Sequence, residues 1–350
     1  MIKVMVVDDS AFMRKLFTDS IEKDKNLKVI DTARNGKDAL KKLKNNKPDV
    51  ITLDIEMPVK DGLTTLKEIN KYYPEIPVIM VSALDNRDTV MKALEIGAFE
   101  FIPKPSGSIS LNIDDIIDEL QEKIKVSINA ENNQNKSFES DFKVKRSIKN
   151  KVKNTNYTVT NFPIIAIGTS SGGPKALKDV LTAFPSDFPG AIAIVQHMPA
   201  GFTTSLANRL NQQSNLNIKE AKQGDKLKPG HALIAPGDYH LTFNSEGEAE
   251  LDQRKKNWGV RPCVDYMLKS LAKCYKERTI GVILTGMGHD GGKGMTAIKN
   301  NGGYGIVEAK KTALVYGMPG TTIKAGAYDK ILPRYEIPAY IIRLIDKEMN

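Results

Sequence analysis

Short apolar runs alternate with longer segments of helical periodicity along the first third of the chain. The apolar runs predict strands, and apolar positions recurring every three or four residues between them predict helices. The predicted strands are Lys3–Val7, Val29–Asp31, Val50–Leu53, Val78–Val81 and Phe99–Ile102. The predicted helices include Ala11–Lys23, Gly36–Asn45, Gly62–Tyr72 and Thr89–Ile96. This alternation predicts an open parallel α/β sheet with helices on both faces.

The pattern stops after residue 126 and returns near residue 161. Residues 127–160 are rich in Asn and Lys, contain neither Gly nor Pro, and hold seven Lys/Arg against three Asp/Glu. Such a segment buries too little apolar surface to offset the entropy of ordering it. We therefore predict a first domain over residues 1–126, a flexible polar linker over 127–160, with helical continuation allowed at its start, and a second domain over 161–350.

The second domain also alternates strands and helices, and a hairpin interrupts it. Its predicted strands are Ile164–Gly168, Ala191–Gln196, His231–Ala235, Thr279–Leu284 and Tyr304–Val307. Its predicted helices are Lys175–Ala183, Thr203–Gln212, Val264–Cys274, Gly292–Asn300 and Tyr335–Lys347. The segment Asp238–Asp252, with Gly247 at a turn, is typical of an antiparallel hairpin. A doubly wound, mainly parallel α/β domain with a β-hairpin is expected.

Composition narrows the class of protein without naming a function. The formal net charge of +9 is compatible with acidic partners, although scattered surface lysines explain much of it. No stretch approaches the roughly 18 apolar residues of a membrane span, and the first residues run directly into a strand. Two cysteines are too few for a disulfide framework. A cytoplasmic protein without membrane insertion is expected.

Acidic residues follow two strands of the first domain, and a lysine follows a third. Asp8 and Asp9 come after the first strand, and Asp54 ends the third. Lys104 follows the fifth strand, so all four lie at the edge where parallel strands end. Carboxylates gathered there repel one another unless a hard cation such as Mg²⁺ lies among them. A carboxylate beside Mg²⁺ and a lysine is suited to accept a phosphoryl group.

Four motifs in order carry these residues, although any one aspartate alone is as typical of a helix cap or a surface charge. The motifs are Asp8-Asp9-Ser10, Asp54-Ile55-Glu56-Met57-Pro58-x-x-Asp61-Gly62, Val81-Ser82-Ala83 and Lys104-Pro105. Together they resemble the receiver domain of two-component response regulators, which has a flavodoxin-like (βα)5 fold.

The receiver resemblance implies a role for each matched residue. Asp54 is implied as the phosphoacceptor. The implied Mg²⁺ ligands are Asp8, Asp9, Asp54 and the backbone carbonyl of Glu56. Ser82 and Lys104 are implied to contact the phosphoryl group, and Phe101 matches an aromatic switch position.

A serine embedded in glycines follows the first strand of the second domain. The spacing Gly168-x-Ser170-x-Gly172, with Pro174 suited to a first helical position, places the serine on a sharp strand-to-helix turn. This is the arrangement of a nucleophile elbow. The alternatives are a turn without chemistry and a phosphate-binding loop.

A nucleophilic serine needs a base and an acid that orients the base. His197 follows the strand after Ser170, and Asp290 follows the strand Thr279–Leu284, so parallel strands bring all three to one edge. Glycines around Asp290 permit a backbone N–H to approach a developing oxyanion.

Each of these assignments has an alternative. A lone histidine after a strand is commonly structural, and His289 is a rival base. Asp290 alternatively caps the helix beginning at Gly291. His231 and His240 look like strand or turn residues.

Six segments of the second domain match one family. They are Gly168-Thr169-Ser170-Ser171-Gly172-Gly173, Gln196-His197-Met198-Pro199-x-Gly201-Phe202-Thr203, Ala235-Pro236-Gly237, Arg261-Pro262 with Val264-Asp265, Thr285-Gly286-Met287-Gly288-x-Asp290-Gly291, and Tyr316-Gly317-Met318-Pro319. Residues 161–347 thus resemble the catalytic domain of the chemotaxis methylesterases (CheB), in which a receiver is joined to a receptor-demethylating domain.

The CheB resemblance implies a catalytic set. Ser170 is the implied nucleophile, His197 the general base, Asp290 its orienting acid and the backbone around Met287 an oxyanion contributor. No cofactor is expected in this domain. Ser171 and Cys263 stand where threonine and serine are common, and neither is expected to bear the chemistry.

The implied function is hydrolysis of glutamate γ-methyl esters on chemoreceptors, with deamidation of specific receptor glutamines, in chemotactic adaptation. A chemotaxis histidine kinase is the implied phosphodonor, and we hypothesise that the unphosphorylated receiver covers the Ser170 edge. Two rivals remain: a response regulator whose second domain only binds, for instance DNA, and a nucleotide-binding fold. Against the first alternative, the second domain lacks a compact helix-turn-helix pattern, so no nucleic-acid partner is expected. Against the second alternative, the second strand of this domain is not followed by the acidic residue that a dinucleotide-binding fold uses to hold the ribose.

Overall fold

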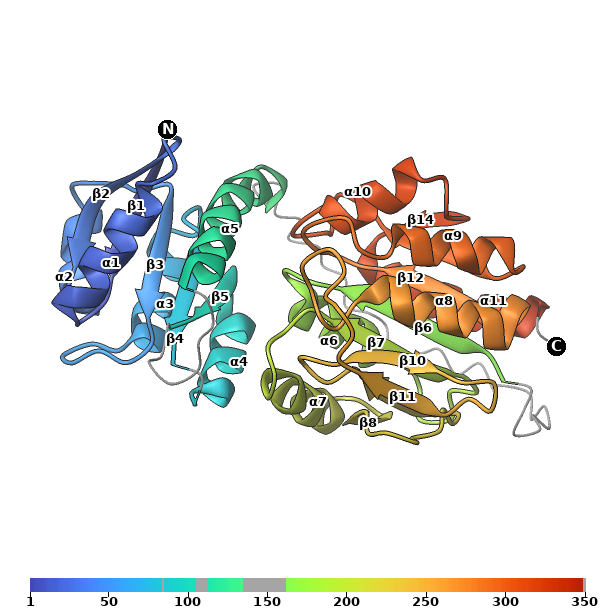
Figure 1. Ribbon diagram of the computed structural model, residues 1–350. Helices are drawn as coiled ribbons and strands as arrows, with labels where there is room; N and C mark the ends of the chain where they lie inside the picture. Colours follow the sequence, from blue (N-terminus) through green and yellow to red (C-terminus); the bar gives the residue numbers. More distant parts are fainter. Residues whose placement is uncertain (84, 105–112, 135–161, 349–350) are drawn as a thin grey trace. The chain divides into compact units, whose positions relative to one another are not determined.

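The computed structural model describes residues 1–83, 85–104, 113–134 and 162–348. The chain divides into two compact units, Met1–Asn135 and Lys136–Asn350. Each unit has its own sheet (Figure 1).

The first unit is a five-stranded parallel sheet in the order β2-β1-β3-β4-β5. Its strands are β1 (Ile2–Val7), β2 (Leu27–Ala33), β3 (Val50–Asp54), β4 (Val78–Ser82) and β5 (Glu100–Pro103). Its helices are α1 (Ala11–Ile21), α2 (Gly36–Leu43), α3 (Gly62–Tyr72), α4 (Arg87–Ile96) and α5 (Ile113–Gln134). Every residue of the central strands β3 and β4 is buried, as expected of a sheet covered on both faces.

The structure contains the helical continuation that was expected at the start of the linker. Helix α5 continues to Gln134, so the first eight residues of segment 127–160 are helical. Ile124 is buried and Ser127 donates from its hydroxyl to the Ile124 carbonyl, so the helix still has a packed face where the linker was expected to begin. The rest of that segment lies outside the described residues, as does Pro105 of the Lys104-Pro105 motif.

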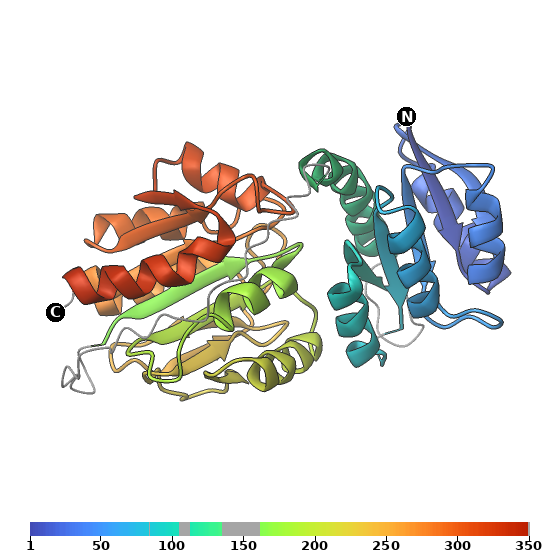
Figure 2. The same ribbon diagram turned by 180° about the vertical axis from the view of Figure 1, so that it is seen from behind.

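The second unit contains a seven-stranded parallel sheet in the order β14-β13-β12-β6-β7-β9-β8. Its strands are β6 (Ile164–Thr169), β7 (Ala191–Gln196), β8 (Asn217–Glu220), β9 (His231–Ile234), β12 (Thr279–Ile283), β13 (Tyr304–Glu308) and β14 (Lys330–Leu332). Its helices are α6 (Gly173–Leu181), α7 (Phe202–Gln213), α8 (Val264–Tyr275), α9 (Gly292–Asn300), α10 (Gly317–Lys324) and α11 (Ile337–Glu348), with 3-10 turns at Lys276–Arg278 and Arg334–Glu336. Figure 1 shows α8 and α9 over one face of this sheet, and Figure 2 shows α6 and α11 over the other, which is a doubly wound fold.

The expected hairpin forms a separate sheet. Strands β10 (His240–Phe243) and β11 (Ala249–Asp252) pair antiparallel, and Gly247 lies in the turn with φ of 75°. Strands β8 and β14 and helix α10 are not predicted by the sequence pattern. The two strands are short and sit at the sheet edges, where half-exposed positions break the apolar pattern.

The strand order creates a switch point in the second unit. From β6 the chain builds the sheet outward through β7, and it later returns to the other side of β6 with β12. Helices then leave neighbouring strands toward opposite faces, and the carboxyl ends of β6, β7 and β12 lie at the switch point, where doubly wound folds bind their ligands. Within the described residues no helix is long and apolar enough to cross a membrane.

Candidate active site and receiver site

Ser170 lies immediately after β6, on the turn that leads into α6. Its backbone N–H donates to the carbonyl of Thr285 at 3.0 Å, which ties the turn to the end of β12. Gly172 caps α6 with φ of 76°, a conformation that a residue with a Cβ adopts only with strain. The turn is therefore sharp, as the elbow spacing predicted, and the Ser170 side chain is only partly buried.

His197 occupies the position next to Ser170 on the neighbouring strand. Thr169 of β6 is in register with Gln196 of β7, and the N–H of His197 donates to the carbonyl of Thr169 at 3.2 Å. The Gln196 amide donates to the carbonyls of both Ser170 and His197, at 3.0 and 3.2 Å. One buried side chain thus holds the two loops together.

Asp290 completes the group from the loop after β12. Its Oδ2 lies 3.0 Å from His197 Nε2. An ionised carboxylate can only accept, so Nε2 carries the proton and Nδ1 is left as the basic nitrogen of the ring. The ring is thus left with one nitrogen that is able to accept a proton.

Backbone donors surround the Asp290 carboxylate at the start of α8. It accepts from the N–H groups of Val264 and Asp265 at 2.6 and 2.9 Å and from the thiol of Cys263 at 3.2 Å. Burial by itself raises the pKa of Asp290, but the hydrogen bonds from His197 and the backbone together hold this pKa below its ordinary value. Asp290 therefore stays ionised beside the histidine.

Two alternatives concerned Asp290 as a helix cap and His289 as a rival base. Asp290 accepts from the Gly291 N–H just before α9, at 2.8 Å, and it also caps the first turn of α8. The first turn of α9 instead donates to Asp265, from Gly294 N–H at 2.7 Å. His289 is exposed and its Nδ1 lies 3.0 Å from the hydroxyl of Thr321, whereas the histidine that contacts Asp290 is His197.

Met287 lies in the loop between β12 and Asp290. The loop is pinned because Gly286 donates to Val315 and Met318 donates to Gly286, at 3.0 and 2.9 Å. The Met287 N–H finds no acceptor among the residues that the structure describes. Met287 therefore carries a free backbone donor close to the Ser170 turn. Its neighbour Gly286 packs against that turn, because a Cβ built on Gly286 would lie only 3.0 Å from Ser170 Cβ.

The acidic residues of the first unit also gather as expected. Carboxylate oxygens of Asp8, Asp9 and Asp54 lie within 4.8 Å of one another. The Lys104 ammonium lies 2.9 Å from Asp8 and 2.7 Å from Asp54. Burial raises the pKa of Asp54 to about 6, against the lowering effect of Lys104. Three hard oxygen donors in this space fit the ligand preference of Mg²⁺.

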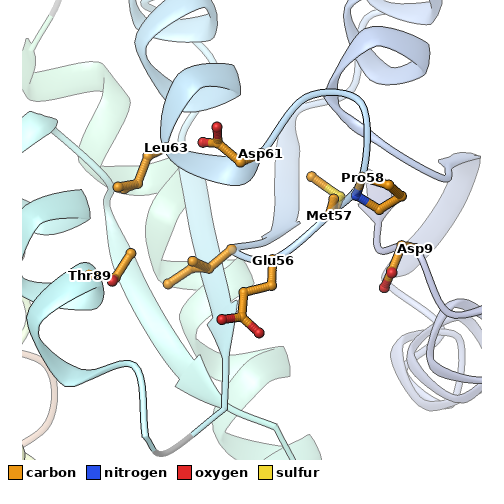
Figure 3. A pocket seen from close by; sticks show the side chains of 8 residues that line it. Asp9, Glu56, Met57, Pro58, Asp61, Leu63 and Thr89 are labelled. Atoms are coloured by element: carbon orange, nitrogen blue, oxygen red, sulfur yellow. The ribbon is translucent and has the colours of Figure 1, made fainter.

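A hollow beside this cluster is lined by the β3–α3 loop (Figure 3). Its lining residues are Asp9, Ile55, Glu56, Met57, Pro58, Asp61, Leu63 and Thr89. The Glu56 side chain is exposed there, while its backbone N–H bonds to the Asp54 carboxylate. The loop is held tightly, because a Cβ on Gly62 would lie 2.2 Å from the carbonyl oxygen of Asp54.

Ser82 and Phe101 are buried near the same edge. The Ser82 hydroxyl donates to the carbonyl of Ala83 at 3.0 Å. The Phe101 ring lies 5.5 Å from the ammonium of Lys123, and the Lys123 ammonium also donates to the Phe101 carbonyl at 2.8 Å.

Three residues that shape the candidate site could not be assigned to it from the sequence. Asp265 was noted only as a member of a motif and Cys263 only as a departure from the family pattern, and both contact Asp290. Glu308, at the end of β13, accepts from the Thr285 N–H at 2.7 Å and so supports the residue that holds Ser170. A buried acid ending a strand, as Asp54 does, was the available signal for Glu308.

Two family profiles match the chain. The family described as CheB methylesterase matches residues 165–341, and the response regulator receiver domain matches residues 4–113.

Similar proteins cover nearly the whole chain. A protein-glutamate methylesterase/protein-glutamine glutaminase of Symbiobacterium thermophilum is 43% identical over 98% of this chain and 97% of that protein. A protein of the same name from Halalkalibacterium halodurans is 44% identical over 98% of both. The crystal structure of the Thermotoga maritima CheB methylesterase catalytic domain aligns with a TM-score of 0.51 and 47% identity, covering 52% of this chain and 98% of that one.

Proposed function

This chain belongs to the CheB methylesterase family and carries a response regulator receiver domain, and from that premise we propose that it is a serine hydrolase that demethylates glutamate γ-methyl esters on chemoreceptors. It also deamidates specific receptor glutamines. The observation that carries the proposal is the His197–Asp290 hydrogen bond at the strand ends beside Ser170. The names of full-length relatives support the same activity.

In the first half of the reaction, Ser170 Oγ attacks the γ-carbonyl carbon of the ester while His197 Nδ1 takes the hydroxyl proton. Asp290 stabilises the imidazolium that forms. The Met287 N–H donates to the oxyanion of the tetrahedral intermediate. When that intermediate collapses, the C–O bond to the methoxy group breaks and His197 returns the proton, which releases methanol.

In the second half, water hydrolyses the acyl-serine. His197 takes a proton from the attacking water, the Ser170 ester bond breaks, and the proton passes to Ser170 Oγ. The product is a glutamate carboxylate. A glutamine substrate follows the same route, with ammonia as the leaving group in place of methanol.

The receiver unit supplies control. We propose that Asp54 accepts a phosphoryl group from a histidine kinase and that this activates the esterase. Asp8, Asp9, Asp54 and the Glu56 carbonyl would hold Mg²⁺, which when bound neutralises charge on the transferring oxygens. Lys104, which pairs with Asp54 at 2.7 Å, then contacts the phosphoryl oxygens, with Ser82 beside it and Phe101 as the switch residue.

The catalytic proposal is tested by methanol release from a methyl-esterified receptor fragment. Ser170→Ala is expected to lower kcat by about a thousandfold or more while folding is retained. Ser171→Ala is the matched control, because it removes the adjacent hydroxyl and leaves the backbone unchanged. Unchanged methanol release from Ser170→Ala would reject the serine mechanism.

The activation proposal is tested with the full chain, Mg²⁺ and a small-molecule phosphodonor. The donor is expected to raise methanol release from the wild type and to leave Asp54→Asn at its basal rate. Omitting Mg²⁺ is expected to abolish the stimulation. The hypothesis that the receiver inhibits the esterase would fail if residues 155–350 and the full chain had equal rates without the donor.

A further inference from the structure

Trp258 occupies an unusual backbone position on the surface of the second unit. Asn257 and Val260 exchange N–H to carbonyl hydrogen bonds across Trp258 and Gly259, whose φ values are 55° and 76°. Positive φ at both central positions is the geometry of a type I′ turn, which favours Asn and Gly. A bulky aromatic residue is strained there, and this one is 44% exposed.

The exposed indole is held in place by the active-site framework. Its Nε1 donates to Asp265 Oδ2 at 3.0 Å, and the Asp265 N–H donates to Asp290 at 2.9 Å. The indole ring also lies 5.9 Å from the ring of His289 and 5.1 Å from the ammonium of Lys293. Trp258 is therefore an immobilised aromatic face two hydrogen bonds from the acid that orients His197.

The segment around Trp258 is strongly basic. Between Asp252 and Asp265 the sequence holds Arg254, Lys255, Lys256 and Arg261 and no acidic residue. The two arginines are neutralised, because Arg254 pairs with Asp252 and Arg261 pairs with Asp238.

The lysines differ from the arginines. Lys255, Lys256 and Lys293 are exposed, and among the described residues none of them has an acidic partner. Unpaired positive charge therefore remains on the segment that carries Trp258 and, through Lys293, 5.1 Å from the indole ring.

We propose that Trp258, Lys255, Lys256 and Lys293 form a docking surface for a substrate segment that carries ionised glutamates beside the scissile ester. The inference rests on the proposed function and specifies which part of the substrate is recognised. Both proposed reactions produce glutamate carboxylates, so a substrate modified at several positions becomes more acidic as the reaction proceeds. Three lysines complement that charge, and the indole supplies a rigid apolar contact.

The test compares two helix-forming peptides that each carry one glutamate γ-methyl ester. One peptide has glutamates three and four residues from the ester, and the other has alanines there. The full-length wild type is expected to hydrolyse the acidic peptide with the higher kcat/KM. Combining Lys255→Glu, Lys256→Glu and Lys293→Glu is expected to lower kcat/KM for the acidic peptide by about tenfold and to leave the alanine peptide unchanged.

The matched control is Lys273→Glu, an exposed lysine near the carboxyl end of α8, far along the helix from Asp265. It is expected to leave both peptides unaffected. An unchanged acidic-peptide rate in the triple variant would overturn the docking surface. Equal losses on both peptides would also overturn it, because they would indicate a role in positioning Asp290.

A binding measurement separates this inference from the proposed function. Trp258 is the single tryptophan of the chain, so its emission reports directly on this surface. In a Ser170→Ala background the acidic peptide is expected to change the emission, with a weaker Kd in the triple lysine variant. Failure of the wild type to hydrolyse either peptide would count against the esterase alone. Peptide binding without any change in Trp258 emission would count against the docking surface.

Discussion

Two buried carboxylates in the second unit, Asp265 and Asp290, each accept hydrogen bonds from the start of a helix on the other's segment. Asp290 precedes α9 but accepts from the first N–H groups of α8, and Asp265 in the first turn of α8 accepts from Gly294 in α9. Each charge therefore sits at the positive end of a helix dipole, which offsets its desolvation. The same arrangement that stabilises two helices keeps Asp290 ionised and oriented toward His197.

Asp290→Asn is expected to lower kcat for methyl-ester hydrolysis by about a thousandfold or more, because the neutral amide no longer stabilises the imidazolium. Steady-state kinetics on a methyl-esterified peptide measure the effect. Asp225→Asn is the control, since Asp225 also accepts a backbone N–H and pairs with a lysine, at 2.7 Å in both cases. A similar loss in both variants would indicate a general effect on the fold.

The stability contributed by Asp290 is expected to depend on pH in one direction. Its pKa is lower in the folded protein, so the unfolded chain binds more protons and stability is lost as pH falls. The difference in unfolding free energy between wild type and Asp290→Asn should therefore be constant above about pH 5 and shrink below about pH 4. Denaturant unfolding across this range tests the sign, and a difference that grew on acidification would contradict it.

Helix α5 is anchored to the first unit by a buried lysine. The Lys123 ammonium lies 2.7 Å from both Glu100 of β5 and Glu119 of α5, and burial of the group is outweighed by these two charges, which raise its pKa. Because Glu100 is also buried, the pair joins helix to sheet in a place where both charges are largely removed from water. Such a pair is costly to break from one side.

Lys123→Ala is expected to destabilise the first unit by about 3–5 kcal/mol, because it leaves the Glu100 carboxylate buried without its partner. Lys125→Ala on the same helix is the control. Lys125 pairs with Asp24 and Glu122 at the surface, and such pairs contribute below about 1 kcal/mol. If chemical denaturation gave both variants the same loss of unfolding free energy, the buried pair would contribute no more than the surface pair.

At the scale of the whole molecule, each unit encloses its own core. The apolar cluster of the second unit runs from Phe162 to Ala327 and includes no residue of the first. Each sheet also consists only of strands from its own unit. The two units are therefore expected to unfold as separate cooperative transitions.

Scanning calorimetry of the full chain should accordingly resolve two transitions. Lys123→Ala is expected to lower one of them, and Glu308→Ala the other, because Glu308 is buried between Thr285 and Arg334. A single transition that shifts with both variants would contradict independent folding of the units.

Local patterns predicted most of the strands and helices that place these sites. Buried parallel strands such as Val50–Asp54 are uninterrupted apolar runs, and they can be recognised without knowledge of their neighbours. The edge strand Asn217–Glu220 alternates buried and exposed positions over only four residues, and it was missed for that reason. Helical continuation past residue 126 was expected but without an end point, because the polar composition of the segment resembles that of a linker.

The sequence by itself determined which side chains follow which strands, because strand ends are marked by local changes in hydrophobicity. Ser170, His197 and Asp290 were found in that way. Only the tertiary structure decided what holds them, through Gln196 between two loops, the crossed caps of Asp265 and Asp290, and Glu308 beneath Thr285. These contacts join segments that are far apart in the chain, and hydrogen bonds between such segments leave no periodic trace in the residues that make them.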